Sequence, residues 1–487
     1  MATLSTNPEP DNTDTTLCCH PLAGKCCYVR LPQRIILAIL LHFLLQSNFS
    51  NRIVLNIAIV EMVEPAKNDP DHQPACPEFE QPNHTQEGSF SWSQTTKSLI
   101  LYAFYIGYTP TQIPGGWLAD KYGARYVLIV SVLITITSSA TLPVTVHHFG
   151  YIAAVVNRLV LGASHGVCIP CTASLVSTWI PPEERATLGS LCYSGMNLGV
   201  VAGSLITGVL MEFFNSWSPV FYLWGGYSGI YLIFLCLYLF SFPDDHPFMS
   251  QVENEYIRSA SGLINLSRQP KNTPWKAILT NAPYWANVWA QFAHHFIYFT
   301  IITYLPTYMS DILMYGVAHD GLFAAMPFAA MYLFSLVLSF TTSKVFLRCM
   351  TKKTFDKYFG AGSNVVSSAL LLAATFSECN RYLVNFFFIA SMIVKAFYYV
   401  TLPININTLS RNYGGLLYGG MNAISSISGV IGNLIMGYLA AEKQFFGWKI
   451  AFSIMLALSV VTTVAFFIFS SDERQEFDYL EDEIRDK

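Results

Sequence analysis

Residues 188–211 read LGSLCYSGMNLGVVAGSLITGVLM, a run of 24 residues without Asp, Glu, Lys or Arg. An α-helix needs about 20 such residues to cross the ~30 Å hydrocarbon core of a bilayer. The run is therefore long enough to span a membrane. The whole chain agrees with this, because its 487 residues are 53% apolar and only 12% charged, whereas an average soluble chain carries about 25% charged residues.

Similar apolar runs flank this one on both sides. A polar stretch at 243–281 separates six of them from another six. The predicted fold is an all-α polytopic membrane protein with twelve transmembrane helices in two six-helix bundles, surrounded by the lipid bilayer. The twelve predicted spans are 35–60, 97–118, 126–142, 151–178, 188–211, 219–242, 284–308, 322–342, 358–376, 382–402, 415–440 and 448–469.

The two halves of the chain resemble each other at their fifth spans. The fifth reads Gly195-Met196-Asn197 and the eleventh reads Gly420-Met421-Asn422, each among further glycines. Small residues at such spacing let helices pack closely in lipid, and paired repeats with a site between them are typical of secondary transporters. Chance similarity of two glycine-rich helices is the alternative interpretation.

Lysine and arginine are distributed unevenly across the predicted topology. With the amino terminus inside, 19 of the 27 fall on the inner side and 5 on the outer side. The positive-inside rule therefore places both termini in the cytoplasm. The predicted parts are a cytoplasmic tail (1–34), a first bundle (35–242) with an extracytoplasmic loop (61–96), a cytoplasmic linker (243–282), a second bundle (283–470) and an acidic cytoplasmic tail (471–487).

The outer loop and the cysteines bear on the compartment. Asn83 begins an Asn-His-Thr sequon in the loop and is expected to be glycosylated. Several of the eleven cysteines lie in apolar segments, where a buried thiol behaves as a small hydrophobe. We therefore expect no disulfide framework and free, reduced thiols.

A net charge of -4 without a basic run excludes a nucleic-acid partner.

The ionisable residues inside the predicted spans are all cations or potential cations. An arginine at the centre of a helix costs about 2.5–3.5 kcal/mol on insertion scales, and no carboxylate is encoded deep inside a span to offset this cost. We infer that the missing counter-ion is an anionic substrate in a water-filled cavity, because the planar guanidinium binds carboxylate or phosphate oxygens in a bidentate way. The ionisable residues inside the predicted spans are Arg52, Arg158, His165, His294, His295 and Lys395.

Structural explanations for these residues stay open. Arg52 or Arg158 could snorkel or pair structurally, and a histidine in a helix is often a hydrogen-bonded structural residue. Arg158 and His165 are seven residues apart, so they share one helix face and are expected to line one wall. His165 or His294 could carry a coupled proton, because histidine titrates near pH 6.5.

Enzyme and pump motifs fail in this chain. No Gly-x-x-x-x-Gly-Lys-Ser/Thr sequence is present, which argues against ATP-driven pumping. The sequence Gly162-Ala163-Ser164-His165-Gly166 matches Gly-x-Ser-x-Gly. A hydrolase nucleophile of this type must follow a β-strand, and this one does not. The chain is predicted not to be an enzyme and to need no cofactor besides a coupling ion, Na⁺ or H⁺. A channel or a non-transporting receptor on a transporter scaffold remains an alternative.

At the end of the second predicted span, residues 116–125 read GWLADKYGAR. This sequence resembles the signature loop of the major facilitator superfamily, with Ala124 at a usually basic position. The resemblance implies a gate. Gly116 would allow close helix contact, Gly123 would allow the turn, and Asp120 would form a contact with Arg125 that breaks and re-forms. Lys121 belongs to the same loop.

The chain also resembles, within that superfamily, the anion:cation symporter family that includes sialin, the vesicular glutamate transporters and the sodium-phosphate cotransporters. The resemblance implies that Arg52 and Arg158 bind the anion. His165 stands where proton-driven vesicular members have a glutamate, and His294 stands where the glutamate-carrying branch has an arginine. The resemblance to this family rests on residues 52–63, 179–185 (WIPPEER), 220–222 (VFY), 246–247 (HP), 256–257 (YI), 273–276 (TPWK), 305–309 (LPTYM) and 413–422.

The resemblance is strongest to the phosphate and organic-anion branch, where sodium is the usual partner. Asn197 and Asn422 could supply neutral oxygens to sodium. We therefore predict cation-coupled alternating access that moves inorganic phosphate or an organic anion, with the plasma membrane favoured over a lysosomal or vesicular membrane. A proton-driven vesicular or lysosomal exporter of acidic sugars or amino acids is the first alternative. A non-transporting receptor is the second.

Overall fold

The structure is a computed structural model that describes residues 31–63, 76, 90–261, 273–313, 317–439 and 445–478. Its long helices are α1 (Gln33–Met62), α2 (Gln94–Tyr122), α3 (Ala124–Gly166), α4 (Cys168–Trp179), α5 (Ser190–Phe214), α6 (Ser218–Tyr238), α9 (Ala282–Asp311), α10 (Val317–Thr341), α13 (Gly362–Ala374), α14 (Arg381–Lys395), α16 (Gly414–Leu439) and α17 (Phe445–Phe469). Shorter segments connect them: η1 (Arg185–Gly189), η2 (Pro243–Asp245), α7 (Gln251–Ser261), α8 (Trp275–Leu279), η3 (Thr342–Phe346), α11 (Leu347–Cys349), α12 (Lys352–Phe355), η4 (Asp356–Ala361), η5 (Ala396–Val400), α15 (Leu402–Leu409) and η7 (Glu476–Asp478).

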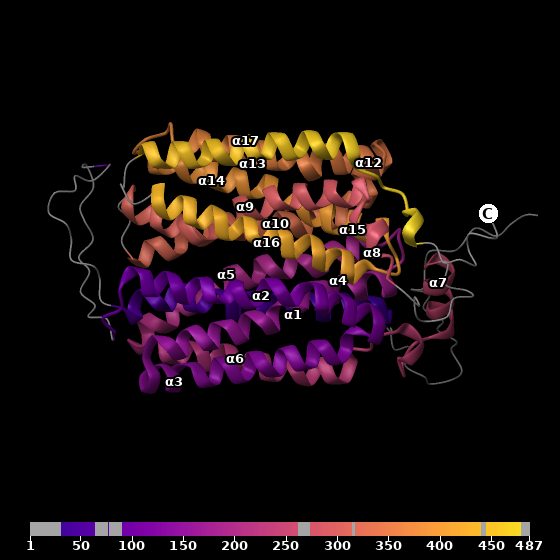
Figure 1. The fold of residues 1–487 in the computed structure, drawn as a ribbon, viewed down its shortest axis with the longest axis horizontal. Helices are drawn as coiled ribbons and strands as arrows, with labels where there is room; N and C mark the ends of the chain where they lie inside the picture. The colour runs from indigo at the N-terminus through magenta and orange to yellow at the C-terminus, as the bar shows by residue number, and fades with distance from the viewer. Residues whose placement is uncertain are drawn as a thin grey trace, which may run out of the picture.

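The long helices form two groups that lie side by side with roughly parallel axes (Figure 1). Helices α1 to α6, in indigo to magenta, form the first half, and α9 to α17, in salmon to yellow, form the second. Within the described ranges, seven helical stretches are long and apolar enough to cross a membrane. Apolar side chains such as Ile230, Ile233 and Val461 are more than 60% exposed, as expected where a helix faces lipid. The predicted all-α membrane fold is confirmed.

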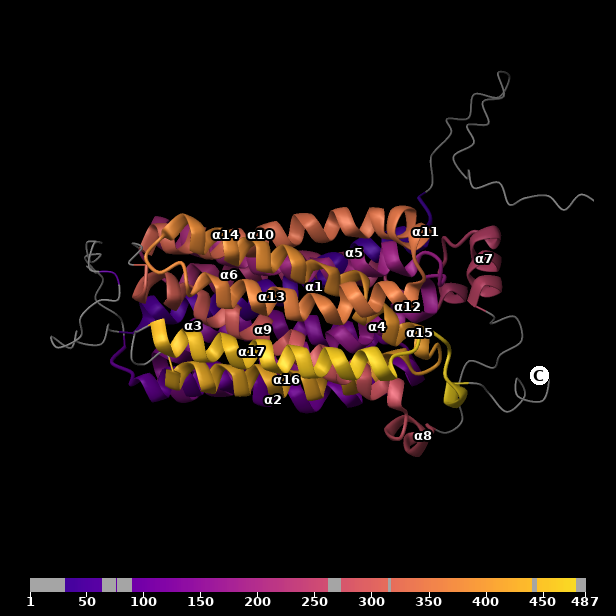
Figure 2. The ribbon, with the colours of Figure 1, turned by 90° about the horizontal axis from the view of Figure 1, so that it is seen from above.

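The two ends of the molecule differ in what they carry. Helices α7, α8, α12 and α15 lie at the same end, on the right in Figure 1 and Figure 2. We call this the inner end, because the distribution of lysine and arginine predicts that it faces the cytoplasm. The opposite end is called the outer end.

Helix α3 contains two predicted spans that meet at a sharp turn. Gly150 has a φ of 63° and a ψ of -147°, a conformation that a residue with a Cβ rarely adopts. The turn separates the predicted span at 126–142 from the one at 151–178. Together with α4, the second part of α3 forms the helix that carries Arg158 and His165.

The predicted span at 382–402 is broken in the structure. Helix α14 ends at Lys395, η5 follows as a 3₁₀-helix, and Thr401 has a φ of -120° and a ψ of -88° before α15 begins. Pro403 lacks a backbone N–H and cannot continue the preceding helix. Broken helices of this kind recur at the binding sites of transporters, and η5 indeed faces the space between the two halves.

The glycine-rich fifth spans pack closely in both halves. A Cβ atom on Gly195 of α5 would lie 2.0 Å from the carbonyl oxygen of His42 in α1. A Cβ atom on Gly420 of α16 would lie 2.4 Å from the Tyr284 hydroxyl in α9. The first and fifth long helices of each half therefore pack against each other, which is the arrangement that an internal repeat produces.

The expectation that all cysteines are free is wrong. Cys76 and Cys379 form a disulfide across a sequence separation of 303 residues. It joins the outer loop after α1 to the connection between α13 and α14, so it links the two halves covalently. Proximity of residues so far apart in sequence depends on the tertiary fold. Asn83 and the cysteines of the amino-terminal tail lie outside the described residues.

Candidate functional site

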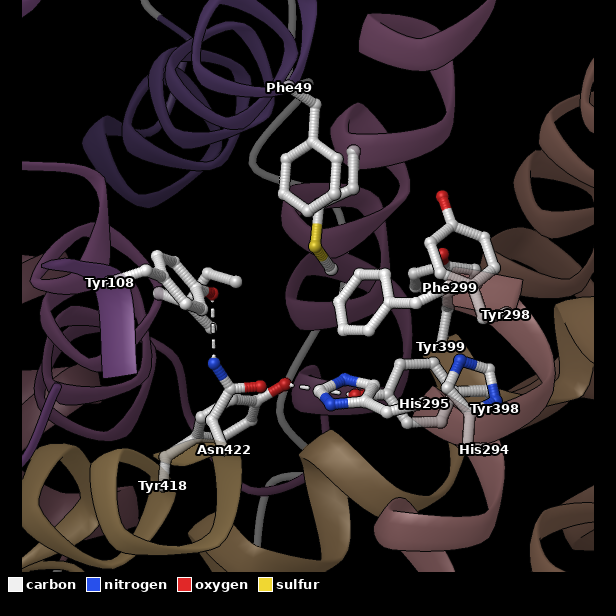
Figure 3. Close-up of a pocket in the computed structure, with 12 residues that line it drawn as sticks. Phe49, Tyr108, His294, His295, Tyr298, Phe299, Tyr398, Tyr399, Tyr418 and Asn422 are labelled. Carbon is white, nitrogen blue, oxygen red and sulfur yellow. Dashed lines mark hydrogen bonds between the residues drawn. The ribbon is translucent and has the colours of Figure 1, made fainter. Parts of the chain in front are cut away.

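A small cavity lies between the two halves and is walled mainly by aromatic rings (Figure 3). Both halves contribute, since α1, α2, α4 and α5 provide one wall and α9, η5 and α16 the other. The interface of two repeats is the typical place for the ligand site of a secondary transporter. The lining residues are Phe49, Tyr108, Ile169, Met196, His294, His295, Tyr298, Phe299, Tyr398, Tyr399, Tyr418 and Asn422.

Arg52 of α1 is not itself among the lining residues, but it lies beside the cavity in contact with rings that line it. Its guanidinium carbon is 4.5 Å from the ring centre of Phe299 in the opposite half and 5.4 Å from that of Tyr108. Cation–π contacts stabilise a guanidinium without neutralising its charge. The side chain is 7% exposed, and its Nη2 atom has no hydrogen-bond partner. Arg52 thus combines a buried charge with an unused donor beside an open space.

Arg158 of α3 has a different environment. Its Nη1 and Nη2 atoms both donate to the carbonyl oxygen of Arg52 at 3.3 Å, and Nη2 also donates to Asn56 Oδ1 at 3.0 Å. The side chain is 2% exposed and is not among the residues that line the cavity. Arg158 therefore supports the backbone of α1 at Arg52.

The charges of the two arginines are not offset by a resident carboxylate in the described part of the chain. The ion pairs found there involve Arg34, Arg258, Lys352 and Arg474. This agrees with the expectation that an external anion completes the site. It does not identify that anion.

His165 was expected to line one cavity wall together with Arg158, but the structure does not place it there. Its Nε2 atom is 3.1 Å from the hydroxyl of Thr135, and its ring meets the ring of Phe104 edge-on at 5.7 Å. The residue is fully buried and its Nδ1 atom has no partner. Phe104 contacts Arg52, so His165 lies in a layer behind the guanidinium. A shared helix face places two side chains in one direction, but neither Arg158 nor His165 is among the residues that line the cavity.

The opposite wall carries the two predicted histidines of α9. The His294 ring stacks on the Tyr398 ring with centroids 3.6 Å apart and planes inclined by 11°. The His295 ring lies 4.8 Å from the ring of Phe299. The Nδ1 atoms of both histidines lack partners. The structure therefore brings both residues to the cavity.

Lys395 lies behind this wall. Its Nζ atom donates to the carbonyl oxygen of His294 at 3.3 Å and to Asn364 Oδ1 at 2.9 Å, and the side chain is fully buried. Asn364 Nδ2 in turn donates to the carbonyl oxygen of Ala290. The lysine thus joins α14 to α9 and α13, and it does not reach the cavity surface.

Two tyrosines of the broken span are site residues that the sequence reasoning missed. Tyr398 donates to Gln291 Oε1 at 3.2 Å and its hydroxyl is 3.2 Å from that of Tyr418. Tyr399 donates to Asn197 Oδ1 at 2.9 Å. Pro403 was the available signal, because a proline inside a predicted span indicates a break that can turn side chains toward a cavity.

Asn197 and Asn422, the matching asparagines of the repeat, both cross the interface. Asn197 Oδ1 in the first half accepts hydrogen bonds from Tyr298 and Tyr399 in the second. Asn422 in the second half donates through Nδ2 to Tyr108 at 3.0 Å and to Gln112 Oε1 in the first. Both amides therefore hold the halves together beside the cavity, and the Oδ1 atom of Asn422 accepts a hydrogen bond from Gln291 Nε2 at 3.0 Å.

The signature loop at the inner end closes against α16. A Cβ atom on Gly116 would lie 2.1 Å from the carbonyl oxygen of Gly415, so only glycine permits this approach. The Asp120 carboxylate accepts hydrogen bonds from the backbone N–H groups of Gly415 at 3.1 Å and Leu416 at 2.8 Å. The amino terminus of a helix favours such a negative group. Asp120 thus binds the opposite half.

The expected contact between Asp120 and Arg125 is replaced by other partners. Arg125 Nη2 donates to the carbonyl oxygen of Cys236 in α6 at 2.8 Å, within its own half. Gly123 has a φ of 93°, which provides the turn between α2 and α3 as expected. The ammonium group of Lys121 lies 4.7 Å from the ring centre of Trp117.

Further hydrogen bonds join the halves at the inner end. Arg185 of η1 donates through Nη1 to the carbonyl oxygen of Asn407 at 2.9 Å and through Nη2 to that of Ser177 at 2.8 Å. The hydroxyl of Ser190 donates to that of Ser339 at 2.8 Å. Together with Asp120, these contacts close the inner end below the cavity.

Comparisons with known proteins agree with this architecture. Residues 39–414 match the model of the Major Facilitator Superfamily. A solved structure of the proton:xylose symporter XylE, a member of that superfamily, superposes with a TM-score of 0.64, covering 91% of this chain and 97% of that one at 13% identity. This likeness establishes the fold alone.

Relatives cover nearly the whole chain. Sialin from Homo sapiens is 31% identical over 97% of this chain and 97% of its own length. A Drosophila melanogaster protein named "Putative inorganic phosphate cotransporter" is 29% identical over 88% of this chain and 83% of its own, and vesicular glutamate transporter 1 from Bos taurus is 27% identical over 97% and 82%. The chain therefore belongs to the major facilitator superfamily, a family of membrane transporters and not of enzymes, and is related within it to these proteins.

Proposed function

We propose that this protein is a secondary transporter that moves a small organic anion by alternating access, driven by a Na⁺ or H⁺ gradient. The observation that carries the proposal is Arg52, whose charge is buried at the edge of the cavity with a free Nη2 donor. A buried guanidinium without a counter-ion is costly. An anion that enters the cavity relieves this cost and is thereby bound.

The cavity walls favour an organic anion over inorganic phosphate. Rings of Phe49, Phe299, Tyr398 and Tyr418 line the cavity, and those of Phe49 and Phe299 lie 5.3 Å and 4.5 Å from the guanidinium carbon of Arg52. Aromatic faces contribute to binding by burying apolar surface, which inorganic phosphate does not possess. A carboxylate or a similar group on Arg52, with a planar or apolar body against the rings, uses both features. The relative named as a vesicular glutamate transporter fits this class more closely than the one named as a phosphate cotransporter does.

The arrangement also supports a transport cycle. Contacts at the inner end, led by Asp120 with the start of α16, hold the halves together there. Release of those contacts would open the cavity to the inner side, which is the rocking motion expected of paired repeats. Plasma-membrane residence and cytoplasmic termini belong to this proposal.

The alternative of a proton-driven lysosomal or vesicular exporter is supported by the histidines. His294 and His295 line the cavity and each has an Nδ1 atom without a partner, so each can take up a proton where an anion binds. A carboxylate is not among the residues that line the cavity. Proton coupling would therefore use imidazole.

Reconstitution of the purified protein in liposomes tests the proposal. Urate, sialate, glutamate and inorganic phosphate are offered separately under an imposed sodium gradient or an imposed pH gradient. We expect gradient-driven uptake of an organic anion that exceeds phosphate uptake, with Arg52→Gln as the inactive control. Preferred uptake of phosphate would contradict the choice of substrate class. Absence of uptake for every anion under both gradients would favour the non-transporting receptor.

A further inference from the structure

The carboxyl-terminal segment docks onto the inner end of the second half. The backbone N–H of Gln475 donates to the carbonyl oxygen of Leu409 at 3.0 Å. Asn405 Nδ2 donates to the carbonyl oxygen of Ser471 at 3.0 Å, and Asn281 Nδ2 donates to Gln475 Oε1 at 3.0 Å. Residues 471–478, expected to be part of an acidic cytoplasmic tail, are therefore packed against the second half.

Asp478 is the centre of this docking. Its carboxylate is 1% exposed and accepts hydrogen bonds from the backbone N–H groups of Arg411 and Asn412, both at 2.9 Å. It also accepts from the Ser410 hydroxyl and pairs with Arg474. Hydrogen bonds to an ionised carboxylate are about twice as strong as neutral ones. Asp478 thus fixes the backbone of residues 410–412.

The segment that Asp478 fixes leads directly into the gate. The Ser410 hydroxyl accepts a hydrogen bond from the backbone N–H of Tyr413 at 2.9 Å, and α16 begins at Gly414. The N–H groups of the next two residues, Gly415 and Leu416, are those that donate to Asp120. Two carboxylates therefore hold one short stretch of backbone, Asp478 from the same half and Asp120 from the other half.

From this juxtaposition we infer that the carboxyl-terminal segment is part of the inner gate. Asp478 is a positioning residue that holds residues 410–413 in the shape that presents the start of α16 to Asp120. It stays bound throughout the cycle, because the segment and the turn belong to the same half. Asp120 is released when the inner end opens. The inference rests on the proposed alternating-access function, and it adds a regulatory element at the end of the chain.

The test uses Asp478→Asn, which keeps the size of the side chain and removes its charge. Glu476→Gln is the matched control, because Glu476 lies in the same short helix but is exposed. Opening of the inner end is measured in nanodiscs with the full chain carrying Ser343→Cys. Ser343 is half-buried and its hydroxyl is 3.4 Å from that of Thr187 across the interface. The rate of maleimide labelling is followed at that peptide by mass spectrometry.

We expect Asp478→Asn to accelerate labelling about tenfold by shifting the equilibrium toward the inner-open state, and Glu476→Gln to leave the rate unchanged. Asp120→Asn, which weakens the direct contact, is the positive control. Faster labelling with Asp120→Asn but an unchanged rate with Asp478→Asn would overturn the inference while the gate stands. Unchanged rates in both would refute the gate of the proposed function. Ser410→Ala removes one hydrogen bond to Asp478. If Asp478→Asn does not fold, the labelling rate of Ser410→Ala is measured in its place.

Discussion

The two walls of the cavity hold their positive charges in different ways. In the first half, Arg52 is at the cavity edge with an Nη2 atom that has no partner. In the second half, Lys395 lies behind His294 and donates to two protein oxygens. The first wall therefore offers a charge to a ligand, whereas the second uses its charge to hold its own helices and presents imidazole and phenol groups.

This difference indicates that the two halves have different roles at the site. Under the proposed function, the first half binds the anionic group through Arg52, and rings of both halves contact the rest of the molecule. A similar distinction applies within the first half, because Arg158 donates through Nη1 and Nη2 to the Arg52 carbonyl oxygen and through Nη2 to Asn56, although its Nε atom has no partner. Substitutions in the two walls should therefore have effects of different kinds as well as different sizes.

The largest effect is expected from Arg52→Gln. Removing the charged partner of a bound group costs about 2–5 kcal/mol, or about 30-fold or more in affinity, so uptake should be abolished. Arg52→Lys keeps the charge without the planar fork and should retain part of the activity. Uptake by proteoliposomes with equal amounts of folded protein is the measurement. Full activity of Arg52→Gln would remove the distinction between the walls.

Arg158→Gln should also reduce transport, but by less than Arg52→Gln does. The substitution removes the donors that hold the Arg52 backbone, and hydrogen bonds from a charged group are worth about 1.5–3 kcal/mol. We expect KM to rise about tenfold while some transport remains. A loss as complete as that of Arg52→Gln would show that Arg158 contacts the anion itself.

Lys395→Met should act mainly on stability. It leaves the His294 carbonyl oxygen and Asn364 Oδ1 without their donor, which costs about 1–3 kcal/mol for each unsatisfied buried group. The melting temperature of the purified protein should fall, and KM at a permissive temperature should change less than about threefold. Lys395→Arg, which keeps a donor and a charge, serves as the comparison. A large change in KM without a change in melting temperature would place this lysine in the binding site.

The smallest effect is expected from His165→Gln. His165 is behind Phe104, and its hydrogen-bonding contact is with Thr135, which glutamine can replace. Uptake should stay within about threefold of the unsubstituted protein under either gradient. Selective loss of uptake under a pH gradient would instead identify His165 as a coupling residue.

The sequence allowed most of the fold to be predicted and part of the site. The membrane helices, the division into halves and the cavity residues His294, His295 and Asn422 follow from apolar runs, from the repeat and from polar groups inside spans. The aromatic residues Tyr398 and Tyr399 were missed, because a 3₁₀-helix after α14 turns them toward the cavity. The partner of Asp120 was predicted wrongly, because Gly415 lies in the other half.

By itself, then, the sequence determined that the chain is a membrane protein and that its buried cations lack encoded counter-charges. Both properties are sums over residue types along short windows, so they do not require knowledge of what packs against what. Only the tertiary structure decided which arginine is free, which cysteines pair and where Asp478 binds. These outcomes depend on contacts between residues as distant as Cys76 and Cys379, and such contacts arise from the packing of the two halves.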